Sequence, residues 1–205
     1  HIADDQITLA KMASGTDGNI ISYDASGNPV AIATGSDGQV LTSTGAGSPP
    51  AFEAIPSGGK IGQCLQATFT GTQTIDAATT WTDVTSLSQA ITPVATSSKV
   101  LIMWSVNVGS TSDAATRLLR ATTAIAVGDA ASARGQASTD GSARNNAEAI
   151  THTMMWLDSP STTSATTYKI QAVGGSTTIN TSDADSDSFD YYRTVSTLTV
   201  MEVLA

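Results

Sequence analysis

Residues 15–22 read GTDGNIIS and residues 35–42 read GSDGQVLT, so one pattern returns after twenty positions. Each copy joins a Gly/Asp turn to a short apolar pair, which is too small to form a hydrophobic core within one chain. We expect these residues to be buried against neighbouring repeats or identical chains around a shared axis. The repeat therefore predicts an extended fibre shaft, and the residues expected at its axis are Ile20, Ile21, Val40 and Leu41.

The composition favours an all-β protein that associates with copies of itself. The chain has 205 residues, with 17 glycines and only 13% charged residues. Thr and Val suit strands, Gly and Asp suit turns, and the residues that usually fill helices are sparse. Aromatic residues make up 5% of the chain, so a lone monomer would have a thin core. We expect a trimer or another multimer with little helix.

The chain divides in two, with a boundary near residue 57. Residues 56–59 read PSGG, which is the composition of a hinge or linker. Residues 1–57 are expected to form the repeat-containing shaft, and residues 58–205 a C-terminal head. About seven to eight strands in the head suit an antiparallel, jelly-roll-like β-sandwich. Apolar and alternating stretches predict these strands at 61–70, 80–87, 99–108, 116–127, 149–157, 167–173 and 192–204.

The first quarter of the chain is similar to a known kind of repeat. Residues 2–13 read IADDQITLAKMA, and the similarity continues through residues 15–24 and 35–43 to residues 49–52. These strings resemble the shaft repeats of bacteriophage tail fibres, whose units read as an apolar residue, Ala-Asp, Ile-Thr and Ala-Lys. Similar strings occur in other virion fibres as well. The resemblance implies a trimeric virion fibre whose shaft carries a β-sandwich head.

Charge and motif patterns speak against several classes of function. The net charge is −9, from 18 acidic and 9 basic residues, and it would repel a phosphate backbone, so we expect no nucleic acid partner. The longest apolar run, residues 100–104, is too short to span a bilayer, so we expect no membrane insertion. Nucleotide-binding and nucleophile motifs are absent from the sequence. We therefore expect no enzymatic activity and no cofactor other than the metal considered next.

Alternating carboxylates near the C-terminus form a candidate calcium site. Asp183, Asp185 and Asp187 occupy an acidic stretch, and carboxylates in such a loop can gather around a hard cation. If Asp183 is position one of a calcium loop, Ser188 stands where Gly is needed and Thr194 where a bidentate Glu is needed. A solvated acidic turn is the alternative, and these two departures favour it.

Receptor-binding residues are expected in a polar loop at 128–146. Polar side chains on a loop that a rigid scaffold holds are suited to recognising a glycan or a protein. A tryptophan face adds contact area for a sugar ring, and Trp81 is a candidate for this role. Trp104 and Trp156 lie within apolar strands and are expected in the core. The remaining candidates are Arg134, Gln136, Arg144, Asn145 and Asn146.

These features lead to one main hypothesis and two alternatives. The chain is expected to be a structural fibre protein of a virion, an extracellular appendage whose heads adhere to a host surface glycan or protein without catalysis. Because it begins with His1 and not with Met, we expect a missing N-terminal region that attaches to other virion proteins. A capsid-attached head fibre or decoration protein is the first alternative, and a cellular surface filament or adhesin is the second.

Overall fold

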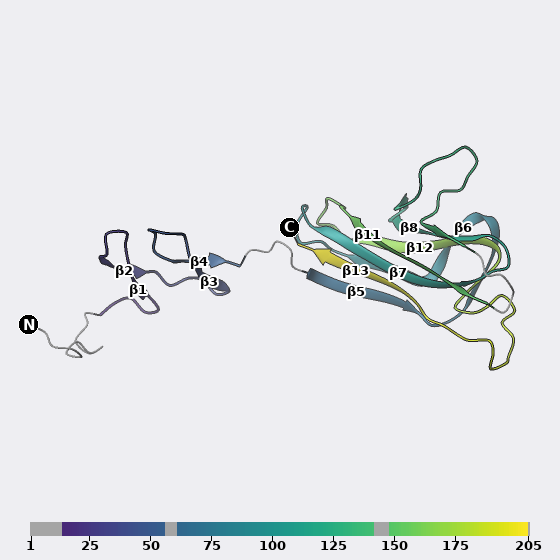
Figure 1. The fold of residues 1–205 in the computed structure, drawn as a ribbon, viewed down its shortest axis with the longest axis horizontal. Coiled ribbons are helices and arrows are strands. Elements are labelled where there is room, and N and C mark those ends of the chain that lie inside the picture. Colours follow the sequence, from purple (N-terminus) through teal and green to yellow (C-terminus); the bar gives the residue numbers. More distant parts are fainter. Residues whose placement is uncertain (1–13, 56–60, 142–147, 205) are drawn as a thin grey trace, which may run out of the picture. The chain divides into compact units, whose positions relative to one another are not determined.

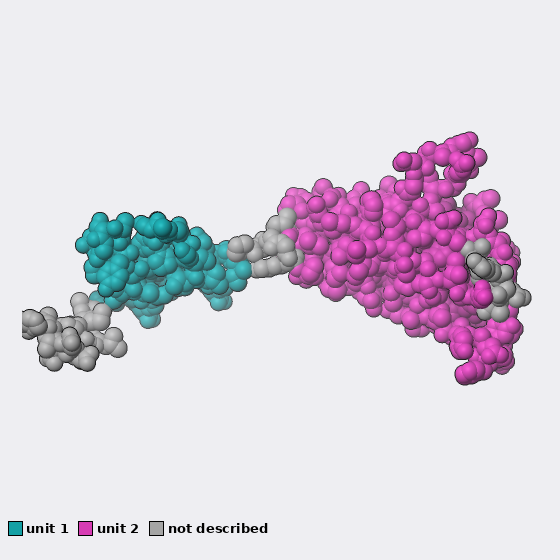
Figure 2. All heavy atoms as spheres, in the orientation of Figure 1, with its two compact units in different colours: residues 1–56 teal, residues 57–205 magenta. Residues whose placement is uncertain are grey.

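The computed structural model describes residues 14–55, 61–141 and 148–204, and these contain thirteen strands and no helix. The expected all-β class is therefore confirmed. The chain divides into two compact units, residues 1–56 (unit 1) and residues 57–205 (unit 2) (Figure 2). The fibre-like residues 2–13 and the linker expected at residues 56–59 lie outside the described residues.

Unit 1 contains two β-hairpins, one for each copy of the sequence repeat (Figure 1). In the first hairpin, β1 (Ile20–Tyr23) pairs antiparallel with β2 (Pro29–Ile32). In the second, β3 (Gln39–Thr42) pairs antiparallel with β4 (Ala51–Ala54). The apolar pair of each repeat thus lies in the first strand of its hairpin.

The Gly/Asp turns that precede β1 and β3 share one geometry. The Asn19 N–H donates to the Thr16 carbonyl at 3.2 Å, and the equivalent bond in the second turn joins Gln39 to Ser36 at 3.1 Å. The glycines within these turns have φ of +77° and +81°, which the third position of a type II turn requires and which glycine adopts without strain. The sequence repeat is therefore also a repeat of local structure.

No described residue of unit 1 is buried. Ile21 is 58% exposed and Leu41 is 45% exposed, and their neighbours Ile20 and Val40 are exposed too. Successive side chains of a strand point to opposite faces, so the two apolar residues of a pair point in opposite directions. Ile20 and Ile21 therefore cannot both face one axis, and neither can Val40 and Leu41. At most one residue of each pair can do so.

The described residues of unit 2 form nine strands that hydrogen-bond into one antiparallel sheet. β13 lies between β5 and β7, and β11 pairs with the other side of β7. β12 lies between β6 and β8, and both β9 and β10 pair with β8. The nine strands are β5 (Ile61–Phe69), β6 (Gln73–Ile91), β7 (Lys99–Gly109), β8 (Ala114–Arg120), β9 (Thr123–Ile125), β10 (Thr139–Asp140), β11 (Ile150–Asp158), β12 (Thr166–Ile179) and β13 (Ser196–Val203).

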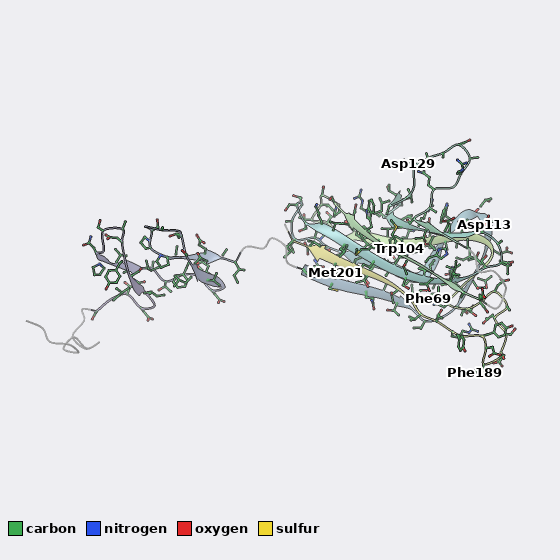
Figure 3. All side chains as sticks on the ribbon, in the orientation of Figure 1. Phe69, Trp104, Asp113, Asp129, Phe189 and Met201 are labelled. Carbon is green, nitrogen blue, oxygen red and sulfur yellow. The ribbon has the colours of Figure 1, made fainter. Side chains whose placement is uncertain are left out.

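This sheet is folded so that its two halves enclose one core. Only two residue pairs join the halves, Thr178 with Gly109 and Ile179 with Val108. We call the half with β5, β13, β7 and β11 the β13 layer, and the half with β6, β12, β8, β9 and β10 the β12 layer. Side chains from both layers meet in a single hydrophobic core, where Trp104 is one of the largest (Figure 3).

The strands expected from the sequence match the observed strands in most places. The sequence predicts one strand at 116–127, but the chain reverses at Ala121, whose φ is +53°, and forms β8 and β9 there. Trp104 is buried, as predicted. Trp156 is 39% exposed, so the prediction that it lies in the core was wrong. Its strand, β11, pairs with β7 alone among the described strands, so less of the protein surrounds this ring.

Candidate binding surface

The outer face of the β12 layer carries a row of polar side chains that crosses three strands. On β12, Tyr168, Ile170 and Ala172 point into the core, so Lys169 and Gln171 point outward. The strand register places Gln171 between Asp83 of β6 and Arg117 of β8. Three side chains that are far apart in the sequence are thereby brought into line.

Hydrogen bonds connect this row from end to end. Arg117 donates from Nε and Nη2 to Gln171 Oε1 at 2.9 and 2.7 Å, and Gln171 Nε2 donates to Asp83 Oδ1 at 2.7 Å. Lys169 Nζ donates to Asp83 Oδ2, also at 2.7 Å. At the other end, the Arg117 guanidinium carbon lies 4.3 Å from the centre of the Trp81 ring, a cation–π contact. We call these five residues the Arg117 network.

The network places two cations and one carboxylate on a protein of strongly negative charge. Partial burial lowers the pKa of the Arg117 guanidinium, and the charge of Asp83 opposes this effect. Burial on its own would raise the pKa of Asp83, but hydrogen bonds from Lys169 and Gln171 lower it below its usual range. The lowered pKa favours the carboxylate form of Asp83. Counted as formal charges, the two cations and this carboxylate leave the five residues of the network with one positive charge.

A pocket of about 540 Å³ adjoins the network. Ala115 and Val173 line it, and they form the next cross-strand pair on the same face of the sheet, two residues beyond Arg117 and Gln171. Its wall is made by the segment that connects β9 to β10, and its polar groups include three carboxylates. The lining residues are Ala78, Asp113, Ala114, Ala115, Gly128, Asp129, Gly135, Gln136, Ala137, Asp140, Gly141 and Val173.

The segment from residue 126 to residue 138 projects from unit 2 as a loop, with Asp129 on it (Figure 3). Its neck is closed by a hydrogen bond from the Gly128 N–H to the Ala137 carbonyl at 3.1 Å. Gln136 Nε2 donates to the Gly128 carbonyl at 2.7 Å, so this predicted receptor contact helps to hold the neck. Arg134 lies at the tip, in a turn closed by its own N–H to the Ala131 carbonyl, and it is exposed.

Of the other predicted binding residues, the structure describes only Trp81. Trp81 is half-buried, and one face of its ring is covered by Arg117, which limits the area left for a sugar. Arg144, Asn145 and Asn146 lie outside the described residues. The sequence reasoning did not single out Asp83, Arg117, Lys169 or Gln171 as a surface, because only the strand register brings them together.

The acidic loop does not gather its carboxylates as a calcium site would. Asp185 forms an ion pair with Arg193 at 2.9 Å and accepts a hydrogen bond from the Thr181 hydroxyl at 2.7 Å. Within the described ranges, no group of three His, Cys, Asp or Glu side chains is placed to hold a metal ion. The hypothesis of calcium bound by Asp183, Asp185 and Asp187 therefore gains no support from this geometry.

No model of a protein family matches this chain, and no curated protein is similar to it. Among the residues that the structure describes, no helix is long and apolar enough to cross a membrane. The function is therefore inferred from the surfaces of the two units.

Proposed function

We propose that this chain is a structural virion fibre protein, an extracellular appendage in which unit 1 joins three copies and unit 2 adheres to a host surface. The observation that carries this proposal is the repeated hairpin of unit 1, whose apolar residues are exposed in the single chain. Contact of apolar side chains with water is unfavourable, and association of identical chains removes it. The resemblance of residues 2–52 to tail-fibre shaft repeats points in the same direction.

Strand pairing in the second hairpin supports one choice of axis residue, and the repeat extends this choice to the first hairpin. Leu41 lies directly opposite Phe52, so one face of the second hairpin is apolar on both strands. Val40, on the other face, lies opposite Glu53, whose charge would be costly to bury at an axis. In the first hairpin both faces are apolar, because Ile20 lies opposite Ile32 and Ile21 lies opposite Ala31. Ile21 is chosen there because it is equivalent to Leu41 in the repeat. We assign Ile21 and Leu41 to the axis, and Ile20 and Val40 to the outside.

The strand order of unit 2 supports a jelly-roll-like head. A jelly roll has two antiparallel layers of four strands with Greek-key connections. The β13 layer has the order β5-β13-β7-β11, and the β12 layer has the order β6-β12-β8 with β9 and β10 beyond β8. Consecutive strands such as β5 and β6, or β7 and β8, therefore belong to different layers. This architecture occurs in lectin domains and in capsid proteins.

The receptor site is assigned to the β9–β10 loop and the Arg117 network. The loop presents Arg134 to solvent, and the adjoining pocket offers carboxylates that can accept hydrogen bonds from sugar hydroxyls. A host glycan or protein is the partner class that such a surface suits. Three copies of a weak site on one fibre would bind a cell surface by avidity, without catalysis.

One observation favours the alternative of a capsid-attached head fibre or decoration protein. The polar side chains of the Arg117 network hydrogen-bond to one another, so they are satisfied without a ligand. A head that ornaments or stabilises a particle needs no receptor site. A jelly roll suits this role equally well.

The first experiment measures binding of the fluorescently labelled full chain to candidate host cells, with its mass determined by light scattering in the same preparation. Saturable binding by a trimer supports the proposal. Arg134→Ala should weaken this binding, whereas Arg193→Ala, the same change on an exposed arginine of another loop, should not. Both variants should keep their stability within about 1 kcal/mol, because surface substitutions usually do. A trimer that binds no cell but binds capsids would favour the decoration alternative.

A further inference from the structure

The outer face of the β13 layer is apolar at one end, whereas its other rows carry Thr and Ser side chains. On β7, Val100, Ile102 and Trp104 fill the core, so the residues between them, Leu101 and Met103, point outward. The same alternation on β13 turns Met201 and Val203 outward. Figure 3 labels Met201 on this strand.

The strand register gathers these outward residues into three rows. Met155 of β11 lies opposite Met103, and Met103 lies opposite Thr199 of β13. The next row runs across four strands through Leu157, Leu101, Met201 and Cys64, and the last row runs through Lys99, Val203 and Ile61. We call the apolar members of these rows the methionine face: Ile61, Cys64, Leu101, Met103, Met155, Leu157, Met201 and Val203.

All eight residues of the methionine face are accessible in the single chain. Met155 is 63% exposed, and Leu157, Ile61 and Cys64 are also exposed. Leu101, Met103, Met201 and Val203, on the two central strands, are half-buried by their neighbours alone. Lys99, at the end of the last row, is the one charged residue in the three rows.

A sheet face that meets water is normally polar, as the outer face of the β12 layer is. Three rows on four strands, at the usual strand spacings, cover roughly 300–400 Å², an apolar area that commonly marks an interaction site. Met155 and Leu157 also lie on β11, which pairs only with β7 among the described strands. An exposed apolar edge strand favours unwanted association unless a specific partner covers it.

We propose that the methionine face is an interface with a second copy of this chain. The face is almost uncharged, so it has no charge complementarity to offer a charged partner, and a second copy presents a surface of the same chemistry. Methionine side chains adapt to an irregular contact, which suits an interface between neighbouring copies of one chain. Unit 1 supports the same choice of partner, because its exposed apolar residues are also proposed to be covered by copies of this chain.

The area of the face explains why both units are needed. A stable interface buries about 800 Å² on each partner, so roughly 300–400 Å² in unit 2 alone is too small. Contacts between copies in unit 1 add to those in unit 2 within one assembly. The interface uses residues other than the axis residues of unit 1, and it does not depend on whether the head binds a receptor.

Cys64 is a natural reporter for this proposal because it lies on the methionine face and is the chain's only cysteine. The test measures the reaction rate of its thiol with DTNB in the folded full chain, with the mass of the assembly determined by light scattering. A matched control is Cys64→Ser/Ser88→Cys, which moves the thiol to an exposed position opposite Lys169 on the polar outer face. We expect the wild-type thiol to react about tenfold or more slowly than the control thiol, because it reacts only when the interface opens.

Three substitutions complete the test. Met201→Glu places a charge in the centre of the methionine face, opposite Cys64. A single chain tolerates this charge because the position is half-exposed, but an interface would bury it. The substitution should therefore make Cys64 react fast. Met201→Leu and Ser88→Glu should leave the slow reaction unchanged. If the wild-type protein is an oligomer but its Cys64 reacts as fast as the control thiol, the proposed interface is wrong, whereas the assembly through unit 1 is not contradicted. A wild-type monomer overturns both, and far-ultraviolet circular dichroism verifies that each variant is folded.

Discussion

Glu202 is an acidic residue in a row of strand β13 that otherwise faces the core. Its side chain is fully buried, and it accepts hydrogen bonds from the Val94 N–H at 2.6 Å and from Gln63 Nε2 at 3.2 Å. Burial on its own would raise the pKa of Glu202, but these hydrogen bonds lower it below its usual value near 4.5. Through these hydrogen bonds, the carboxylate on β13 connects the segment before β7 with strand β5.

The lowered pKa of Glu202 makes its contribution to stability dependent on pH. The contribution is complete above the pKa of the unfolded chain and is lost as pH falls through the lower pKa of the folded chain. Glu202→Gln should therefore lower the free energy of unfolding by about 1–3 kcal/mol at pH 7, and the difference from wild type should shrink toward pH 3. Urea unfolding at both pH values measures this. Glu148→Gln, on an exposed residue, is the control; equal stability of wild type and Glu202→Gln at pH 7 would contradict the prediction.

A second buried carboxylate, Asp158, joins the edge strand β11 to β12. It accepts a hydrogen bond from the Tyr168 hydroxyl at 2.7 Å, and Arg120 Nη1 lies 3.0 Å from both of its oxygens. Burial raises the pKa of Tyr168, and the hydrogen bond to Asp158 raises it further, so Tyr168 is a neutral donor throughout the working range.

Removal of the Asp158 carboxylate leaves two groups without their partner. Asp158→Ala should lower the free energy of unfolding by about 3–5 kcal/mol, because Tyr168 and Arg120 both lose it. Tyr168→Phe should cost about 1–2 kcal/mol, because it removes one hydrogen bond and keeps the ion pair. Denaturant unfolding of the two variants under the same conditions checks the order. Equal losses would show that the ion pair with Arg120 contributes little.

At the scale of the element, the hairpins of unit 1 are regular strands without a core of their own. Type II turns and strand pairing form locally, but the apolar residues are exposed. Because the two faces of each hairpin are distinguishable, the shared axis can be tested with matched double variants.

Ile21→Asp/Leu41→Asp should convert the assembly to monomers, because like charges from every chain would meet at the axis. Ile20→Asp/Val40→Asp introduces the same charge one residue earlier, on the face that contains Glu53 in the second hairpin, and should leave the assembly intact. Light scattering of both variants gives the mass. Persistence of the assembly in both variants would contradict the shaft, and loss in the second alone would reverse the assignment of faces.

At the scale of the whole molecule, unit 2 has two outer faces of opposite character. The β12 layer presents charges, amides and a pocket, whereas the β13 layer presents methionine and leucine at one end of its outer face. Under the functions proposed above, ligands would bind one of these faces and copies of the chain would contact the other. Substitutions on one face can therefore be made without changing the residues of the other face.

If adhesion depends on several weak sites, assembly should govern its strength. The monomer made by Ile21→Asp/Leu41→Asp should bind host cells about a hundredfold more weakly than the assembled protein, although its loop and pocket are unchanged. Binding isotherms on the same cells, expressed per chain, measure the ratio. The same affinity per chain for monomer and assembly would contradict avidity as the mechanism.

The sequence by itself determined the features of this protein that depend on near neighbours along the chain. The repeat at residues 15–42 predicted its two identical turns, and alternation in residues such as those of β13 predicted most of the strands. Gly, Asp and side-chain periodicity act within a few residues, so their effect can be read without knowledge of the fold.

Only the tertiary structure decided the two faces of unit 2, the exposure of Trp156 and the burial of Glu202. The candidate network joins Asp83, Arg117 and Gln171, and the methionine face joins β5, β7, β11 and β13. Each depends on which distant strands pair and in which register. Many pairings satisfy the same local alternation, and a shift of one residue turns every side chain to the other face of the sheet. Packing of side chains in the common core selects one of these pairings, and that packing cannot be read from a local sequence pattern.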